Sequence, residues 1–263
     1  MAAEALYTTQ LQAGLGMIPE TMELLRLWEP GLSAAQLSAH AREAGIFARG
    51  TARRTRNLVV EMFAPRFLAD GGTAAARIKY LMERRLPHEA FMQLCFLQTA
   101  RAQRILRDFV IEVYWPRYAA GASTIAREAA ERFIQQALDA GKTRVRWSAS
   151  TVSRVSGYLL SSCMDFGLLG DGTVRQRQIR RFSIRQDVAL YLAHELHFHG
   201  LGDMAVVRHA DWRLFGLDAP DVVRLLQSLS HAGHLIIQSS AELVSVSWKY
   251  RTMEECLNAL AQG

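Results

Sequence analysis

The sequence predicts a mainly α-helical protein: a helical N-terminal domain with a helix-turn-helix, then a C-terminal winged-helix-like domain with small β-hairpins. Three observations support this prediction. Most of the 263 residues lie in runs with apolar side chains at helical spacing, bounded by capping residues, glycine or proline. Strand-like runs follow helices and glycine turns at two places, about 168–184 and 234–248. Half of the residues are hydrophobic, which is typical of a chain with a packed core.

The N-terminal domain is expected to span residues 1–140, with the helix-turn-helix at about 33–64. Ser33 begins a capping box at the start of one helix, and Gly45 ends that helix. The next helix begins near residue 51 and is expected to stop at Pro65, because proline lacks the backbone N–H that a helix interior needs. Further helices are expected at about 20–28, 73–85, 88–115 (ended by Pro116) and 123–139.

The C-terminal domain is expected to begin after the glycine at 141 and to span 141–263. Ser148 or Ser150 caps its first helix, which Gly167 ends. A glycine turn and an arginine-rich strand follow, so a basic wing is expected at about 168–184. Later helices are expected at about 187–199, 203–215 and 218–232, before a second hairpin at about 234–248 that carries little charge.

The basic residues are almost all arginine. The formal net charge is +6, and 28 of the 31 basic residues are arginine because the chain has only three lysines. Arginine binds phosphate with two parallel hydrogen bonds and also pairs with guanine, so a polyanionic partner is favoured. A GC-rich genome is an alternative cause of the arginine excess, but codon usage does not explain why the arginines cluster.

The first arginine cluster lies at the start of the second helix of the helix-turn-helix. A recognition helix uses its N-terminal residues on base edges, so this placement predicts nucleic-acid contact. A solvated helix face is the alternative. The candidate contact residues of this first cluster are Arg49, Thr51, Arg53, Arg54, Arg56 and Asn57.

The second arginine cluster runs from the domain boundary through the following helix to the wing. Between Lys142 and Arg185 the chain has nine basic residues against Asp165 and Asp171. This surplus predicts phosphate contacts, with a merely solvated basic hairpin as the alternative. The candidate contact residues of this second cluster are Lys142, Arg144, Arg146, Ser153, Arg154, Arg175, Arg177, Arg180 and Arg181.

Catalytic and metal-binding patterns are not evident, so we expect a protein that is not an enzyme and needs no cofactor. The two histidines at 194 and 197 are three residues apart, whereas a zincin helix needs a spacing of four. A surface or cap cluster is expected for them rather than a metal site. Cys95 and Cys163 lie in apolar helical stretches and are expected to be buried free thiols. No signal peptide or membrane span is evident, which favours a cytoplasmic protein.

Three segments resemble the BrxA family of bacterial BREX phage-defence systems: Thr51–Arg56, Asp108–Pro116, and Trp147–Ser148 through Asp165–Leu169. The resemblance covers roughly residues 5–200 and is weaker in the C-terminal hairpin region. It implies a non-enzymatic, mainly helical protein that acts beside a methyltransferase and an ATPase in phage exclusion. The family is likened both to RNA-binding antitermination proteins and to winged-helix DNA binders, and the resemblance brings no active site.

Together these observations favour double-stranded DNA as the partner of an accessory subunit in the defence system. Two alternatives stay open at this point. One is RNA binding with an antitermination-like role. The other is a scaffold whose basic faces contact other BREX defence proteins.

Overall fold

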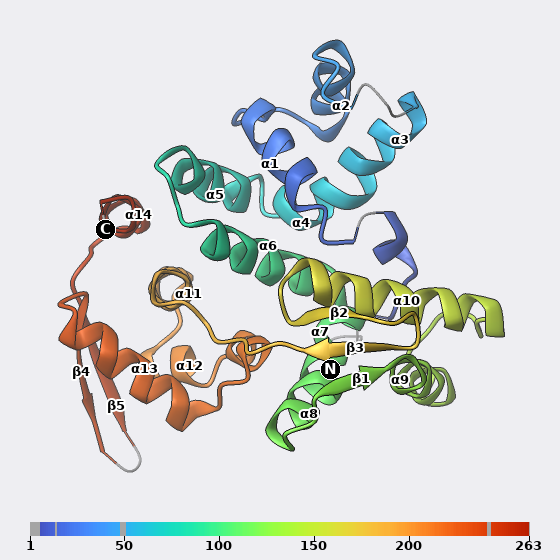
Figure 1. Cartoon of the computed structure of the whole chain (residues 1–263). Helices are drawn as coiled ribbons and strands as arrows, with labels where there is room; N and C mark the ends of the chain where they lie inside the picture. The colour runs from blue at the N-terminus through green and yellow to red at the C-terminus, as the bar shows by residue number, and fades with distance from the viewer. Residues whose placement is uncertain (1–5, 14, 48–50, 241–242, 263) are drawn as a thin grey trace. The chain divides into compact units, whose positions relative to one another are not determined.

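The computed structural model describes residues 6–13, 15–47, 51–240 and 243–262. It is mainly α-helical with short antiparallel strands, which confirms the predicted fold class (Figure 1). The chain forms two compact units: unit 1 comprises 1–79 and 95–181, and unit 2 comprises 80–94 and 182–263. Residue 141 lies within unit 1, and the division into independently folding domains at that position stays a prediction. Among the described residues, none of the helices is long and apolar enough to cross a membrane.

Unit 1 begins with three helices, and side chains cap the second and third of them. The backbone N–H of Gln36 donates to Ser33 Oγ (3.3 Å) and the N–H of Ser33 donates to Gln36 Oε1 (3.0 Å), so the predicted capping box is confirmed. Thr51 caps the third helix through the N–H of Arg54 at 3.2 Å. The first elements are α1 (Ile18–Leu27), α2 (Ala34–Glu43) and α3 (Ala52–Asn57), preceded by the short 3-10 turn Gln10–Ala13.

The third helix does not stop at Pro65, so that prediction is wrong. A π-helical turn, Leu58–Phe63, follows α3 and leads directly into α4 (Ala64–Phe67). The N–H of Ala64 reaches five residues back to the carbonyl of Val59, which widens the turn just before the proline ring. The widened turn accommodates a ring that would meet the preceding carbonyl in a regular α-helix.

The same arrangement occurs at Pro116, the second predicted stop. The π turn Val110–Tyr114 joins α7 (Arg104–Phe109) to α8 (Trp115–Ala119), and the N–H of Trp115 bonds to the carbonyl of Val110. Both π turns lie in copies of one sequence pattern, because 56–67 reads RNLVVEMFAPRF and 107–118 reads RDFVIEVYWPRY. This short internal repeat signals one local structure used twice.

The next two helices, α5 (Thr73–Glu83) and α6 (His88–Ala102), each include residues of both units, because 80–94 belong to unit 2. The later elements of unit 1 follow in the order helix, strand, helix, helix, hairpin. The helix expected over 88–115 is interrupted at Gln103, where the backbone leaves the helical region. β1 (Thr124–Ala126) was not expected, since three residues are too few for an alternating pattern. The elements are α5 (Thr73–Glu83), α6 (His88–Ala102), α7, α8, β1, α9 (Arg127–Asp139), α10 (Ala149–Asp165), β2 (Leu169–Gly172) and β3 (Gln176–Ile179).

The three strands form an antiparallel sheet in which β3 lies between β1 and β2. Ile125 of β1 pairs with Arg177, and its side chain is fully buried. Phe109 is also fully buried, and its ring meets that of Phe133 on α9 edge-on with centroids 5.5 Å apart. The helix before the sheet, the sheet and α9 are therefore held by one apolar core.

Unit 2 contains a helical layer and the second hairpin. Its later elements are α11 (Gln186–Phe198), α12 (Asp203–Val207), the 3-10 turn Ala210–Phe215, α13 (Ala219–His231), β4 (Leu235–Ser239), β5 (Val244–Trp248) and α14 (Met253–Leu260). The predicted hairpin is confirmed, with Leu235 opposite Trp248 and Ser239 opposite Val244. Trp212 is buried and donates its indole N–H to the carbonyl of Val206 at 2.8 Å.

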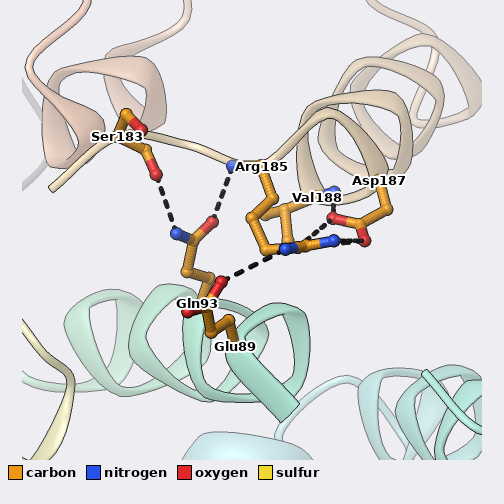
Figure 2. A network of polar contacts seen from close by, with 6 residues as sticks. All are labelled: Glu89, Gln93, Ser183, Arg185, Asp187 and Val188. Atoms are coloured by element: carbon orange, nitrogen blue, oxygen red, sulfur yellow. Dashed lines mark hydrogen bonds and ion pairs between the residues drawn. The ribbon is translucent and has the colours of Figure 1, made fainter. Parts of the chain in front are cut away.

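A polar network fixes the entry into α11 within unit 2 (Figure 2). The buried amide of Gln93 donates to the carbonyl of Ser183 and accepts from the N–H of Arg185, both at 2.9 Å. The guanidinium of Arg185 binds Asp187 at 3.0 Å and Glu89 at 3.2 Å. Because two carboxylates neutralise it and raise its pKa, Arg185 does not add to the basic surface that the sequence counts up to this residue.

Candidate nucleic-acid interface

An arginine joins α9 and α10 by hydrogen bonds where the two helices cross, and the sequence did not predict this role. Arg127, at the start of α9, donates from Nη2 to the carbonyl of Ser153 (2.6 Å) and to its Oγ (3.0 Å). Its Nε also lies 3.5 Å from Glu131. The i,i+4 spacing of Arg127 and Glu131 was the only sequence signal for this residue. Ser153 therefore belongs to the helix crossing as well as to the second cluster.

The inner face of α10 is anchored along its length. Val155, Leu159 and Cys163 are buried, and Ser148 caps the first turn through the N–H of Thr151 at 3.3 Å. At the other end, Asp165 Oδ2 accepts the backbone N–H of Gly16 at 2.8 Å. The helix is thus a fixed support for the side chains on its outer face.

The outer face of α10 carries small and basic side chains in its first turns. Ser150 and Arg154 are exposed, and Gly157 and Tyr158 are partly exposed. A Cβ on Gly157 would meet one atom within 4 Å, the Arg127 Nη2 at 3.9 Å, so Gly157 lies toward the crossing with α9 and has space around it. Tyr158, which belongs to neither arginine cluster, lies four residues after Arg154 and therefore on the same side of the helix.

The β2–β3 hairpin presents its arginines from a tight, internally bonded turn. Thr173 Oγ1 accepts the N–H groups of Arg175 and Gln176, each at 3.2 Å. The carbonyl of Arg175 accepts the N–H of Arg127 at 2.7 Å, which ties the turn to the start of α9. Arg175 is exposed and Arg177 is partly exposed. The structure thus brings the hairpin, α9 and the crossing with α10 together.

The remaining residues of the second cluster take different positions. The strand is shorter than expected and ends at Ile179, so Arg180 and Arg181 follow β3. The N–H of Arg180 still donates to the carbonyl of Leu168, just before β2, at 3.0 Å. Arg144 is exposed. Lys142 lies 3.8 Å from Glu112, and Arg146 lies 3.1 Å from Asp139 on the surface. Such exposed pairs contribute little and exchange readily for another anion.

A groove of about 700 Å³ between α9 and α10 has mixed charge. Trp147, Arg132 and Arg146 line it together with Glu128 and Glu131. The two carboxylates oppose phosphate binding in this hollow.

The first cluster lies on α3, which packs on α2 and on the π turn that follows it. Arg53, Arg54 and Arg56 are exposed, whereas Asn57 is partly exposed. The hydroxyl of Thr51 caps α3 by accepting the N–H of Arg54. Arg49 lies outside the described residues. Within the described ranges, no ion pair engages Arg53, Arg54, Arg56, Arg154, Arg175 or Arg177, so their charge is available to a partner.

The expected surface or cap cluster is wrong for His194, which is fully buried. Its Nδ1 lies 3.0 Å from the carbonyl of Leu190, and its ring meets Trp248 edge-on at 4.9 Å between centroids. Burial lowers the pKa of His194 to about 4. His197 instead stacks on Trp248, with centroids 4.4 Å apart. Among the described residues, no three histidine, cysteine or acidic side chains gather as metal ligands would. Cys95 and Cys163 are buried free thiols, as predicted.

Three comparisons with known proteins bear on the family resemblance that the sequence indicates. The chain is similar over 80% of its length to the crystal structure of an uncharacterized protein from Magnetospirillum magneticum, which is covered to 97%, with a TM-score of 0.61 and 14% identity. This likeness shows a shared fold. No curated protein matches the chain. The BrxA family model matches residues 5–195, and the chain therefore belongs to the BrxA family, which places it in BREX phage defence.

Proposed function

We propose that this BrxA-family chain is a non-enzymatic accessory subunit that binds double-stranded DNA through the second half of unit 1. The support is an order of elements: the helix ending in α8, then β1, α9, α10 and the β2–β3 hairpin, with β3 between the other strands. That order is the one of a winged helix. In such a module the second helix of the helix pair reads the major groove, and here this helix is α10.

The observation that carries the proposal is the placement of unpaired arginines on two elements of this module. Arg154 extends from the second turn of α10, and Arg175 and Arg177 extend from the hairpin. In the proposed complex the hairpin arginines bind backbone phosphates, while Ser150, Arg154 and Tyr158 face the groove. Phosphate contacts fix position on the duplex, and few side chains are left for base readout.

A salt series tests the proposal directly. With six to eight phosphates neutralised, the logarithm of the binding constant should fall with the logarithm of salt concentration with a slope of about −5 to −7. Fluorescence anisotropy on a labelled 30-base-pair duplex measures this slope. Binding that is absent, or that does not change with salt, contradicts the proposal. Competition by a structured RNA at lower concentration than by the duplex would favour the RNA-binding alternative.

Gly172→Val should weaken DNA binding without any change of charge. A Cβ at this position would lie 2.3 Å from the carbonyl oxygen of Gln176, so a β-branched residue forces the hairpin open. We expect affinity for the duplex to fall at least about tenfold, which corresponds to loss of roughly one charge-assisted contact.

The control for this variant is Gly202→Val. A Cβ at Gly202 meets nothing within 4 Å, and its backbone is extended. DNA binding by this control should match that of the parent chain, and the circular dichroism of both variants should stay helical. Unchanged binding by Gly172→Val would show that the hairpin takes no part in the interface.

A further inference from the structure

A groove of about 660 Å³ lies between α2 and α3, apart from the α10 surface. On the α2 side the lining residues extend from Ala34 to Arg42, nine residues or roughly 12 Å of helix. The other side is α3 and the start of the π turn. The groove lining consists of Ala34, Ala35, Ser38, Ala39, Arg42, Ala52, Arg53, Arg56 and Val60.

The groove is lined by small side chains, here called its floor, and by three arginines, here called its rim. The side chains of four alanines, Ser38 and Val60 are small, so the backbone of another helix can approach α2 and α3 closely in this groove. Arg42, Arg53 and Arg56 are exposed around this floor. Among the described residues, no acidic side chain lines the groove, and no ion pair joins these three arginines to a carboxylate.

This chemistry suits a protein helix better than DNA. A phosphate backbone is highly solvated, and an alanine-lined hollow gives it nothing to bind between the arginines. An amphipathic helix would bury its apolar stripe on the floor, while carboxylates one turn apart on its flanks would meet the rim. The length of the groove matches two to three turns of such a helix.

We propose that the α2–α3 groove docks an acidic amphipathic helix of another protein of the same BREX system. The proposal assigns Arg53 and Arg56 to protein contact, instead of the DNA contact that the sequence predicts for the first cluster. It is independent of DNA binding by α10 and the hairpin, because the two surfaces share no residue.

The test measures binding of the labelled full chain to each other protein of the system, purified and added one at a time. Arg53→Glu/Arg56→Glu should weaken binding to one of these proteins at least tenfold. The matched pair Arg54→Glu/Arg213→Glu changes the charge equally, but neither residue lines the groove, so binding should change less than twofold. Duplex DNA binding should be retained by both pairs to the same extent.

Cross-linking from a photoreactive residue at Ala39 then identifies the docked segment. We expect a helical segment whose apolar stripe is flanked by aspartate or glutamate, and replacing those carboxylates with lysine should restore binding to the Arg53→Glu/Arg56→Glu chain. The proposal is overturned if no protein of the system distinguishes the two pairs, or if the cross-linked segment lacks carboxylates. It is also overturned if the groove pair loses DNA binding that the matched pair keeps.

Discussion

Arg154→Glu/Arg175→Glu/Arg177→Glu is expected to reduce the affinity for duplex DNA on the order of 1,000-fold. Each arginine would lose a charge-assisted contact of roughly 1.5 kcal/mol, and each new carboxylate would repel the backbone. The slope of the salt dependence should also fall by about three, one for each phosphate contact removed. Anisotropy titrations at several salt concentrations measure both quantities in one experiment.

A second triple variant separates local contact from net charge. Arg208→Glu/Arg213→Glu/Arg251→Glu makes the same charge change at exposed positions of unit 2. Its affinity for the duplex should fall only slightly, because 150 mM salt largely screens long-range repulsion between the new carboxylates and the DNA. Equal losses in the two triple variants would mean that the duplex responds to total charge, and the assignment of α10 and the hairpin would then be wrong.

Acidification from pH 7.5 to 5 should destabilise the chain by about 2 kcal/mol through His194 alone. Burial lowers the folded-state pKa of His194 to about 4 from the ordinary 6.5. The unfolded chain therefore takes up a proton as the pH falls below 6.5, while the folded chain does not. Stability from this residue is complete above pH 6.5 and is lost as the pH falls toward 4. Burial lowers the pKa of His197 and His234 as well, so they act in the same direction.

The control for this effect is His194→Leu, which replaces the buried imidazole with an apolar side chain that does not titrate. Urea unfolding of the parent chain and of this variant at both pH values gives the difference in the free energy of unfolding. We expect the variant to lose about 2 kcal/mol less than the parent chain on acidification. If both chains lose the same stability, His194 is not buried in its neutral form.

Much of the helical structure followed from local sequence. The capping box at Ser33, the start of α3 at Thr51 and the end of α10 before Gly167 each depend on a few neighbouring residues. The two proline stops failed because a π turn changes the hydrogen bonding just before each ring. The pattern shared by 56–67 and 107–118 marks in the sequence the two places where this happens.

The candidate interface was predictable in part. Arg154, Arg175 and Arg177 were selected from charge and a glycine turn, which are local features. Arg127 was not selected, because its role depends on the crossing of α9 and α10. Arg185 is the reverse case: it counts as surface charge in the sequence, but it is paired with Asp187, two residues later, and with Glu89, 96 residues away along the chain.

The sequence by itself determined the helical class, most helix limits, the BrxA resemblance and the two arginine clusters, because caps, periodicity and charge are properties of neighbouring residues. Only the tertiary structure decided which helix pair stands beside a three-stranded sheet, since β1 exists through its pairing with β3, about fifty residues later. Tertiary packing likewise gave Arg53 and Arg56 an alanine-lined groove and left Arg154 on an open helix face. Arginines with the same charge thus have different surroundings in the two clusters, and for this reason we propose a different partner for each cluster.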